Sequence, residues 1–144
     1  MTPKQYLMQY KKILAQVRII EQELSAVEEE IGLVAPSGDG SVHGSDISNH
    51  TERLALRLIG LKDRLYLKRS EAWAKREEIE NVISMAERGE WCRLLYDRYV
   101  CLMSWDDISL DLNYSVDYCK SRLHSAALQS IARFIREENH ERTD

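Results

Sequence analysis

Two long stretches in which apolar residues recur at alternating spacings of three and four restrict this chain to a helical fold. The first stretch contains Tyr6, Tyr10, Ile13, Val17, Ile20, Leu24, Val27 and Ile31. The second contains Leu54, Leu58, Leu61, Leu65, Ala72, Ile79, Val82 and Ala86, with Lys68 and Lys75 at two further positions of the same series. This spacing gathers the apolar residues on one side of a helix, and a long helix cannot bury such a stripe alone. The sequence therefore predicts two long helices that pack against a partner.

Local signals predict where these helices begin and end. Pro3 fits the start of the first helix and Gly32 fits its end. A capping box beginning at Asn49 predicts the start of the second helix, which Gly89 is expected to stop. Residues 35–50 contain Ser and Gly without any period, so we expect a flexible connection there.

The charges at the facing ends favour one arrangement of the two helices. The first helix ends in an acidic cluster of Glu21, Glu23, Glu28, Glu29 and Glu30. The second begins with a basic cluster of Arg53, Arg57, Lys62 and Arg64. An antiparallel hairpin places opposite charges beside the seam, whereas the alternative, a parallel coiled coil between copies, sets the glutamates against each other. We expect the hairpin, and we expect it to form a homo-oligomer, with a dimer favoured.

Two helix starts lie a short distance apart near the C-terminus. Ser104, three residues before Asp107, predicts an N-cap with a capping-box-like carboxylate. Asn113 tolerates the left-handed conformation that ends a helix, and Ser115 predicts the next cap. An amphipathic helix is expected before them, over 90–102. Short helices joined by about three residues, with an amphipathic and partly basic second helix, are typical of a helix-turn-helix.

The last helix divides into faces when it is projected at 100° per residue. Its predicted core face comprises Cys119, Leu123, Ala126, Ala127, Ser130 and Phe134. A second apolar ridge in its C-terminal half comprises Leu128, Ile131 and Ile135. We expect the long hairpin or another subunit to cover this ridge.

The segment from Arg98 to Ile131 resembles the fourth region of bacterial sigma factors. It contains R-Y-V-C-L-M-S-W-D-D-I-S-L-D-L-N-Y-S-V-D-Y-C-K-S-R-L, where that family has R-Y-x-x-x-x-S-x-x-E-I-A-x-x-L-G-x-S-x-x-x-V-K-x-x-L. Leu102 stands where a Gly is usual. The segment also resembles the small phage-encoded, sigma-like regulators of the ArpU and RinA type, which carry a helical N-terminal part ahead of such a module. The resemblance implies a phage setting and the activation of late genes.

In a helix-turn-helix, the first residues of the last helix enter the major groove. The candidate DNA-binding residues are Asp117, Tyr118, Lys120, Ser121, Arg122, Ser125, Arg133 and Arg136. Arg122 is the best candidate to bind guanine, and Lys120, Arg133 and Arg136 are expected to contact phosphate. The alternative is a three-helix packing unit whose basic side is simply solvated.

The charge of the chain does not by itself favour DNA binding. The net charge is −4, and residues 90–144 contain seven Lys and Arg against ten Asp and Glu. No acidic residue lies between Tyr118 and Arg136, however, and a local basic stripe attracts phosphate despite an acidic total.

The sequence predicts no enzyme activity, cofactor or metal site. The three cysteines, Cys92, Cys101 and Cys119, lack metal-type spacing and are expected to be small buried side chains. His43 and His50 are expected to be solvated, and Asp107 with Asp111 to lie on an exposed helix face. No apolar run has membrane-spanning length, and Met1 is not followed by an apolar signal core, so we expect a cytoplasmic protein without membrane contact.

The expected architecture is all-α: a long antiparallel helical hairpin, then a three-helix helix-turn-helix module. We expect oligomerisation through 1–88, including the flexible loop 35–50, DNA binding through 90–136, and a frayed tail at 137–144. The leading hypothesis is a sequence-specific double-stranded DNA-binding transcriptional regulator. One alternative is a small-terminase-like subunit that recognises DNA for packaging. Another is a protein-interaction module acting on RNA polymerase or on another part of the transcription machinery.

Overall fold

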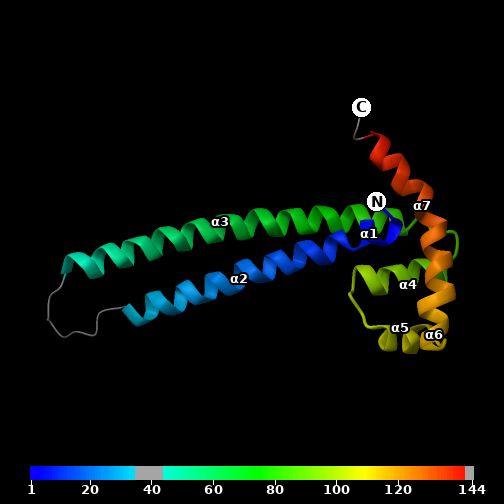
Figure 1. Ribbon diagram of the computed structural model, residues 1–144, viewed down its shortest axis with the longest axis horizontal. Coiled ribbons are helices and arrows are strands. Elements are labelled where there is room, and N and C mark those ends of the chain that lie inside the picture. Colours follow the sequence, from blue (N-terminus) through cyan, green and yellow to red (C-terminus); the bar gives the residue numbers. More distant parts are fainter. Residues whose placement is uncertain (35–43, 142–144) are drawn as a thin grey trace. The chain divides into compact units, whose positions relative to one another are not determined.

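The structure is a computed structural model that describes residues 1–34 and 44–141, with side chains described for 1–33 and 48–135. All regular elements in these residues are helical, as the sequence predicts (Figure 1). They are α1 (Pro3–Leu7), α2 (Gln9–Val34), α3 (Gly44–Ile83), α4 (Gly89–Tyr99), α5 (Trp105–Leu112), α6 (Val116–Tyr118), the π-helical turn η1 (Cys119–Leu123) and α7 (His124–Glu141).

The chain forms two compact units. The hairpin unit is Leu14–Glu71, and the module comprises Met1–Ile13 together with Ala72–Asp144. The first turns of the N-terminal helices and the last turns of α3 therefore belong to the module, although the heptad pattern runs through them without interruption. Within the described parts of the chain, no helix combines the length and the apolar character that a membrane crossing needs.

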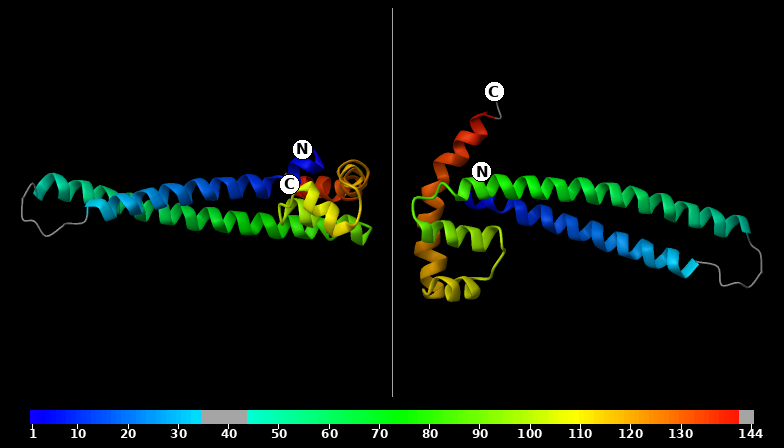
Figure 2. Two further views of the ribbon diagram at one scale, coloured as in Figure 1. Left: turned by 90° about the horizontal axis from the view of Figure 1, so that it is seen from below. Right: turned by 180° about the vertical axis from the view of Figure 1, so that it is seen from behind.

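In the hairpin unit, α2 and α3 lie side by side and run in opposite directions (Figures 1 and 2). Arg69 Nη2 lies 3.1 Å from Glu21 Oε1, and His50 Nε2 lies 3.4 Å from Glu30 Oε1. In both pairs a residue of α2 contacts a residue of α3, and the later residue of α2 pairs with the earlier residue of α3. An antiparallel arrangement requires this order. The predicted antiparallel hairpin is confirmed.

The predicted seam forms the core of the hairpin unit. Its buried members in this unit are Val17, Ile20, Val27, Leu54, Leu61 and Leu65. Leu24, Ile31 and Leu58 are half-buried. Lys68 occupies a seam position, where its ammonium group lies 3.0 Å from the Glu71 carboxylate. Two helices thus bury one stripe each, and their outer faces remain exposed.

The predicted ends of the second long helix were wrong. It begins at Gly44, five residues before Asn49, and residues 35–43 of the expected connection lie outside the described residues. It ends at Ile83, after which backbone hydrogen bonds of the tighter i to i+3 type close the last turn. Gly89 is the first residue of α4, and Arg88 is its extended N-cap. Gly89 therefore marks the start of α4 and not the end of α3.

The first long helix differs from the prediction at both ends. It is divided at Met8, and Thr2 with Gln5 forms the reciprocal capping box that begins α1. Gly32 lies inside α2, which extends to Val34. Because no atom lies within 4 Å of where a Cβ of Gly32 would be, neither packing nor turn geometry requires a glycine at this position.

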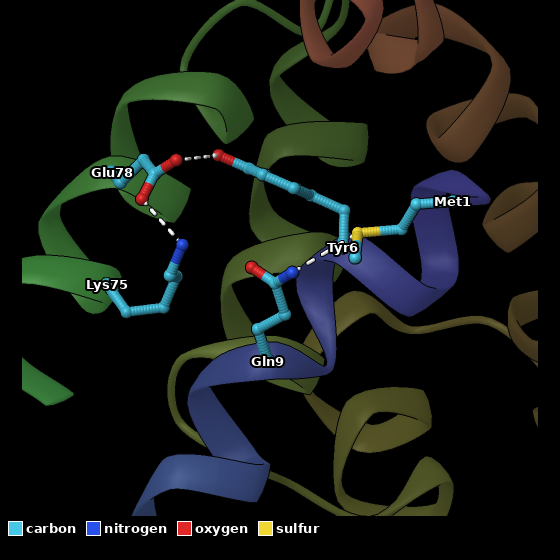
Figure 3. A network of polar contacts seen from close by, with 5 residues as sticks. All are labelled: Met1, Tyr6, Gln9, Lys75 and Glu78. Carbon is cyan, nitrogen blue, oxygen red and sulfur yellow. Dashed lines mark hydrogen bonds and ion pairs between the residues drawn. The ribbon is translucent and has the colours of Figure 1, made fainter. Parts of the chain in front are cut away.

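Polar contacts join the start of the chain to the last turns of α3 within the module (Figure 3). The Tyr6 hydroxyl donates to Glu78 Oε1 at 3.1 Å, and Lys75 Nζ donates to Glu78 Oε2 at 2.8 Å. Lys75 also lies 5.9 Å from the centroid of the Tyr6 ring. Gln9 Nε2 contacts Met1 Sδ at 3.2 Å. The seam lysine Lys75 is therefore paired where an apolar residue would otherwise be expected.

The core of the module is built from residues distant in sequence. Its most fully buried side chains are Leu7, Ile79, Leu94, Leu95, Ile108, Ile131, Ile135 and Cys119. Helix α4 packs against α5 and α7, and α1 packs against α7. Ile131 and Ile135 are therefore buried within one copy of the chain, without a second subunit.

The predicted core face of the last helix is correct in its first part. In the later part, the observed core face lies one residue further along the sequence than the predicted one. Cys119, Leu123 and Ala127 are buried as expected, but Ile131 and Ile135 replace Ser130 and Phe134 as the core residues. The π-helical turn η1 provides the reason, because it holds an extra residue per turn and rotates all later positions. A projection at 100° per residue fails beyond this turn.

Two further predictions, on the cysteines and on the helix over 90–102, were wrong in part. Cys101 is exposed, whereas only Cys119 is buried and Cys92 is half-buried. The helix expected over 90–102 ends at Tyr99, and Leu102 lies in the connection that follows.

Candidate nucleic-acid interface

The caps predicted near the C-terminus are present. Ser104 Oγ accepts from the backbone N–H of Asp107 at 3.2 Å and begins α5. Asn113 ends α5 in the left-handed conformation, with φ 59° and ψ 38°. Ser115 Oγ then accepts from the N–H of Tyr118 at 3.2 Å and begins α6. Helices α5 and α6 are consequently separated by three residues, as the sequence predicts.

The connection between α4 and α5 contains the second left-handed residue of the described chain. Leu102 has φ 57°, which a side chain with a Cβ adopts at a cost of about 1 kcal/mol or more. The turn is held by the Met103 N–H, which donates to the Asp97 carbonyl at 2.9 Å, and by Arg98 Nη1, which donates to the Met103 carbonyl at 2.9 Å. These bonds fix a conformation that glycine would adopt more easily.

The candidate DNA-binding residues with described side chains are all exposed. They are Asp117, Tyr118, Lys120, Ser121, Arg122, Ser125 and Arg133. The side chain of Arg136 lies outside the described residues. None of the described candidates packs inside the protein. Contact with DNA requires this exposure.

Several of these side chains are held by neighbours. The Ser121 hydroxyl donates to the Asp117 carbonyl, and the ring of Tyr118 lies 4.9 Å from that of Tyr114. The Tyr114 hydroxyl in turn donates to Glu90 Oε2 at 2.9 Å. Arg122, in contrast, forms no hydrogen bond or ion pair within the described part of the chain, and its guanidinium is open to a ligand.

Lys120 differs from the other candidates because it lines a cavity. This basic cavity encloses about 270 Å³. It is lined by Lys4, Met8, Lys11, Arg98, Tyr99, Leu102, Trp105, Lys120 and His124. Four of these residues are cationic and none is acidic, so the cavity has a positive potential although the chain as a whole is acidic.

A buried histidine lies at the wall of the basic cavity. His124 Nε2 lies 2.7 Å from the Tyr99 hydroxyl, and the Trp105 ring packs edge-on at 4.9 Å. Burial, with smaller contributions from the charges of Lys4 and Arg98, lowers the pKa of His124 to about 4. Burial also raises the pKa of Tyr99 to about 12. Both rings are therefore neutral near pH 7, and the positive charge of the cavity comes from its lysines and arginine.

A pair of carboxyl groups lies between α4 and α5. Arg93 Nε and Nη2 donate to the two oxygens of Asp111, each at 2.9 Å, and Arg93 Nε lies 3.8 Å from Asp97 Oδ2. Burial raises the pKa of Asp97 to about 6, with a smaller contribution from Asp111. The hydrogen bond with Asp97, and then the one with Arg93, lowers the pKa of Asp111. Asp111 is thus an ion-pair partner and not simply a solvated carboxylate.

No group of three or more His, Cys, Asp or Glu among the described residues is arranged to hold a metal ion. Of the two histidines expected in the connection, His43 lies outside the described residues and His50 is exposed beside Glu30.

Sequence reasoning missed most of the cavity. Lys4 and Lys11 were assigned to the hairpin, and His124 and Arg98 were given no binding role. One signal was present, because Lys4, Met8 and Lys11 follow the helical spacing of four and three and share a side. Nothing in the sequence shows that this side meets Lys120, which lies more than one hundred residues later.

Comparison with known proteins provides no match to this chain. No family model matches it, and neither does any curated protein or solved structure. The exposed side of the α6–η1–α7 helix and the adjacent basic cavity are therefore the features from which a function can be inferred.

Proposed function

We propose that this protein binds double-stranded DNA through the exposed side of the α6–η1–α7 helix and acts as a sequence-specific transcriptional regulator. The observation that most supports this proposal is the solvent exposure of Arg122 and its neighbours on a helix that follows α5 after a three-residue turn. The regulatory role, in a phage setting, rests on the resemblance to sigma-like regulators.

The local distribution of charge is compatible with contact to phosphate. Lys120, Arg122 and Arg133 are exposed, and no acidic residue interrupts the helix between Tyr118 and Ile135. A single module with so few cations binds weakly, because each neutralised phosphate contributes only a small part of the affinity. Two modules on two half-sites would raise the effective concentration of each and strengthen binding.

Exposed apolar side chains in the hairpin unit support self-association. Leu56, Ile59, Tyr66 and Leu67 on α3 are between 58 and 71% exposed. A helix that shows apolar side chains on its outer faces has surface available for another helix. We propose that the hairpin unit forms a dimer that presents two DNA-binding modules.

Selection of bound sites from randomised duplex DNA tests the proposal directly. Arg122→Ala is expected to remove sequence preference, because a bidentate contact with guanine discriminates by about 1–3 kcal/mol. Lys120→Ala is expected to weaken binding to all duplexes alike, because a phosphate contact is independent of sequence. Arg57→Ala, an exposed arginine in the hairpin unit, is the matched control and should leave both properties unchanged.

Two results would replace this proposal with another function. Light scattering that shows a ring of many subunits would favour a DNA-packaging subunit. Failure to retain any duplex DNA at low salt, where phosphate contacts are strongest, would favour a module that binds other proteins of the transcription machinery.

A further inference from the structure

The basic cavity concentrates cations from three separate parts of the module. Lys4 and Lys11 come from the start of the chain, Arg98 from α4, and Lys120 from η1. Like charges gathered around one cavity repel each other, and this repulsion weakens the fold unless something offsets it. The lining contains no carboxylate that could do so.

The lysines of the cavity are available for a ligand. Within the described part of the chain, the ammonium groups of Lys4, Lys11 and Lys120 form no hydrogen bond or ion pair. Five other lysines and arginines of the described chain pair with a carboxylate, and four of them, such as Lys75 and Arg76, use a carboxylate on their own helix. The lining of the cavity offers its cations no such partner, so their charge remains available to an anion.

The arginine of the cavity is held in place. Arg98 donates one N–H to the Met103 carbonyl, and its guanidinium lies 4.8 Å from the centroid of the Trp105 ring. A guanidinium fixed by stacking and by one hydrogen bond keeps further N–H groups to donate to an anion. The left-handed Leu102 lies in the same turn and lines the same cavity, so backbone strain and the fixed arginine occur together.

We infer that the basic cavity binds a phosphate group. A phosphate monoester has a charge close to −2 near pH 7 and three acceptor oxygens, so it can accept from several cations at once, whereas a carboxylate has one charge and two oxygens. The volume of about 270 Å³ lies below the usual range for whole drug-sized ligands, and it suits a phosphate with a small part of the molecule attached to it.

The phosphate could belong to the backbone of bound DNA or to a free phosphorylated small molecule. In the first case the site deepens the proposed DNA-binding function, since Lys120 lies on the same helix as Arg122. In the second case the site is independent of DNA. The chemistry that recognises the ligand is the same, and two measurements distinguish the sources.

The first measurement uses inorganic phosphate and pyrophosphate, with sodium chloride at matched ionic strength as the reference. Isothermal titration of the full chain is expected to detect binding of both anions. Lys11→Gln should weaken that binding by roughly tenfold to a hundredfold, the loss typical of one charge-assisted hydrogen bond. Lys12→Gln is the matched control, because Lys12 is exposed and adjacent in sequence but does not line the cavity.

The second measurement compares the same variants in binding to duplex DNA. If the phosphate belongs to DNA, Lys11→Gln weakens binding to all duplexes and pyrophosphate competes with DNA. If it belongs to a small molecule, Lys11→Gln binds DNA like the unmodified chain while losing affinity for the free anions. Absence of any binding of phosphate and pyrophosphate, or equal behaviour of the Lys11→Gln and Lys12→Gln variants in both measurements, would overturn the inference. If the unmodified chain binds phosphate and pyrophosphate but no duplex DNA, only the proposed function is overturned.

Discussion

The hairpin unit and the module are both helical, but they are stabilised in different ways. The hairpin unit buries one apolar stripe from each of two helices and leaves its ion pairs at the surface. The module buries side chains from α1, α3, α4, α5 and α7 in one core, and it includes the polar residues Asp97 and His124. Repetition in sequence produces the first kind of unit, while the second depends on contacts between distant residues.

This difference has a consequence for function. A two-helix layer has identical requirements along its length and can be extended without changing its chemistry. A core that brings together five elements can place side chains from the start and the end of the chain around one cavity. The binding features described above accordingly lie in the module, whereas the exposed apolar residues of the hairpin unit are suited to association.

The largest expected effect is the difference between two equal truncations. Leu95→Ala in the module should lower the free energy of unfolding by about 3–4 kcal/mol, because Leu95 is fully buried and the cavity left behind cannot collapse. Leu61→Ala in the hairpin unit should cost about 2 kcal/mol, because only one facing helix surrounds it. Urea denaturation followed by circular dichroism measures both. An equal or larger loss at Leu61 would show that another copy of the chain covers this seam.

The buried histidine makes the stability of the module depend on pH. Because the pKa of His124 is lowered to about 4 in the folded state, the unfolded chain binds a proton first as the pH falls. Stability should therefore decrease between pH 6.5 and pH 4, by an amount on the order of 3 kcal/mol for a shift of this size. The measurement is urea denaturation across this range.

His124→Phe is the control for that measurement, since phenylalanine retains an aromatic ring against Trp105 but does not titrate. The difference in stability between the variant and the unmodified chain should depend on pH in the window from 6.5 to 4. Asp97 acts in the opposite direction, because its pKa is raised to about 6 and its contribution is lost as the pH rises from 3.8 through 6. A pH-independent difference for His124→Phe would contradict the assignment of a neutral, buried imidazole.

The smallest expected effect concerns the strained turn of the module. Leu102→Ala and Leu102→Gly remove the same packing apart from one methyl group, but only glycine relieves the left-handed backbone. The glycine variant should be more stable than the alanine variant by about 1 kcal/mol, although glycine ordinarily destabilises a chain. Thermal unfolding of the two variants measures the difference. The reverse order would mean that the Leu102 backbone is unstrained.

Much of the fold could be predicted from the sequence because the relevant signals are local. Ser104, Asn113 and Ser115 act within one turn of their own position, and all three adopt the predicted geometry. The ends of α3 could not be predicted in the same way. Asn49 and Gly89 have the expected chemistry for a start and a stop, but the helix begins at Gly44 and ends at Ile83, because such signals alone do not fix the terminal residue.

The last helix, which carries the candidate binding residues, shows the same difference between what local signals predict and what they do not. The exposure of Arg122 was predicted from helical periodicity over a few residues, and it holds although Arg122 lies within the π-helical turn itself. Beyond that turn, the prediction assigned Ile131 and Ile135 to a second covered ridge and not to the core face, because periodicity alone does not reveal an extra residue in a turn.

The sequence by itself determined the helical class, the apolar seam and the caps, since each depends on residues within a few positions of one another. Only the tertiary structure decided that α1 covers α7 and that Lys4, Lys11, Arg98 and Lys120 surround one cavity. The physical reason is that local hydrogen bonding and periodicity fix a helix and its faces, whereas the choice of which faces meet depends on the combined burial of all elements.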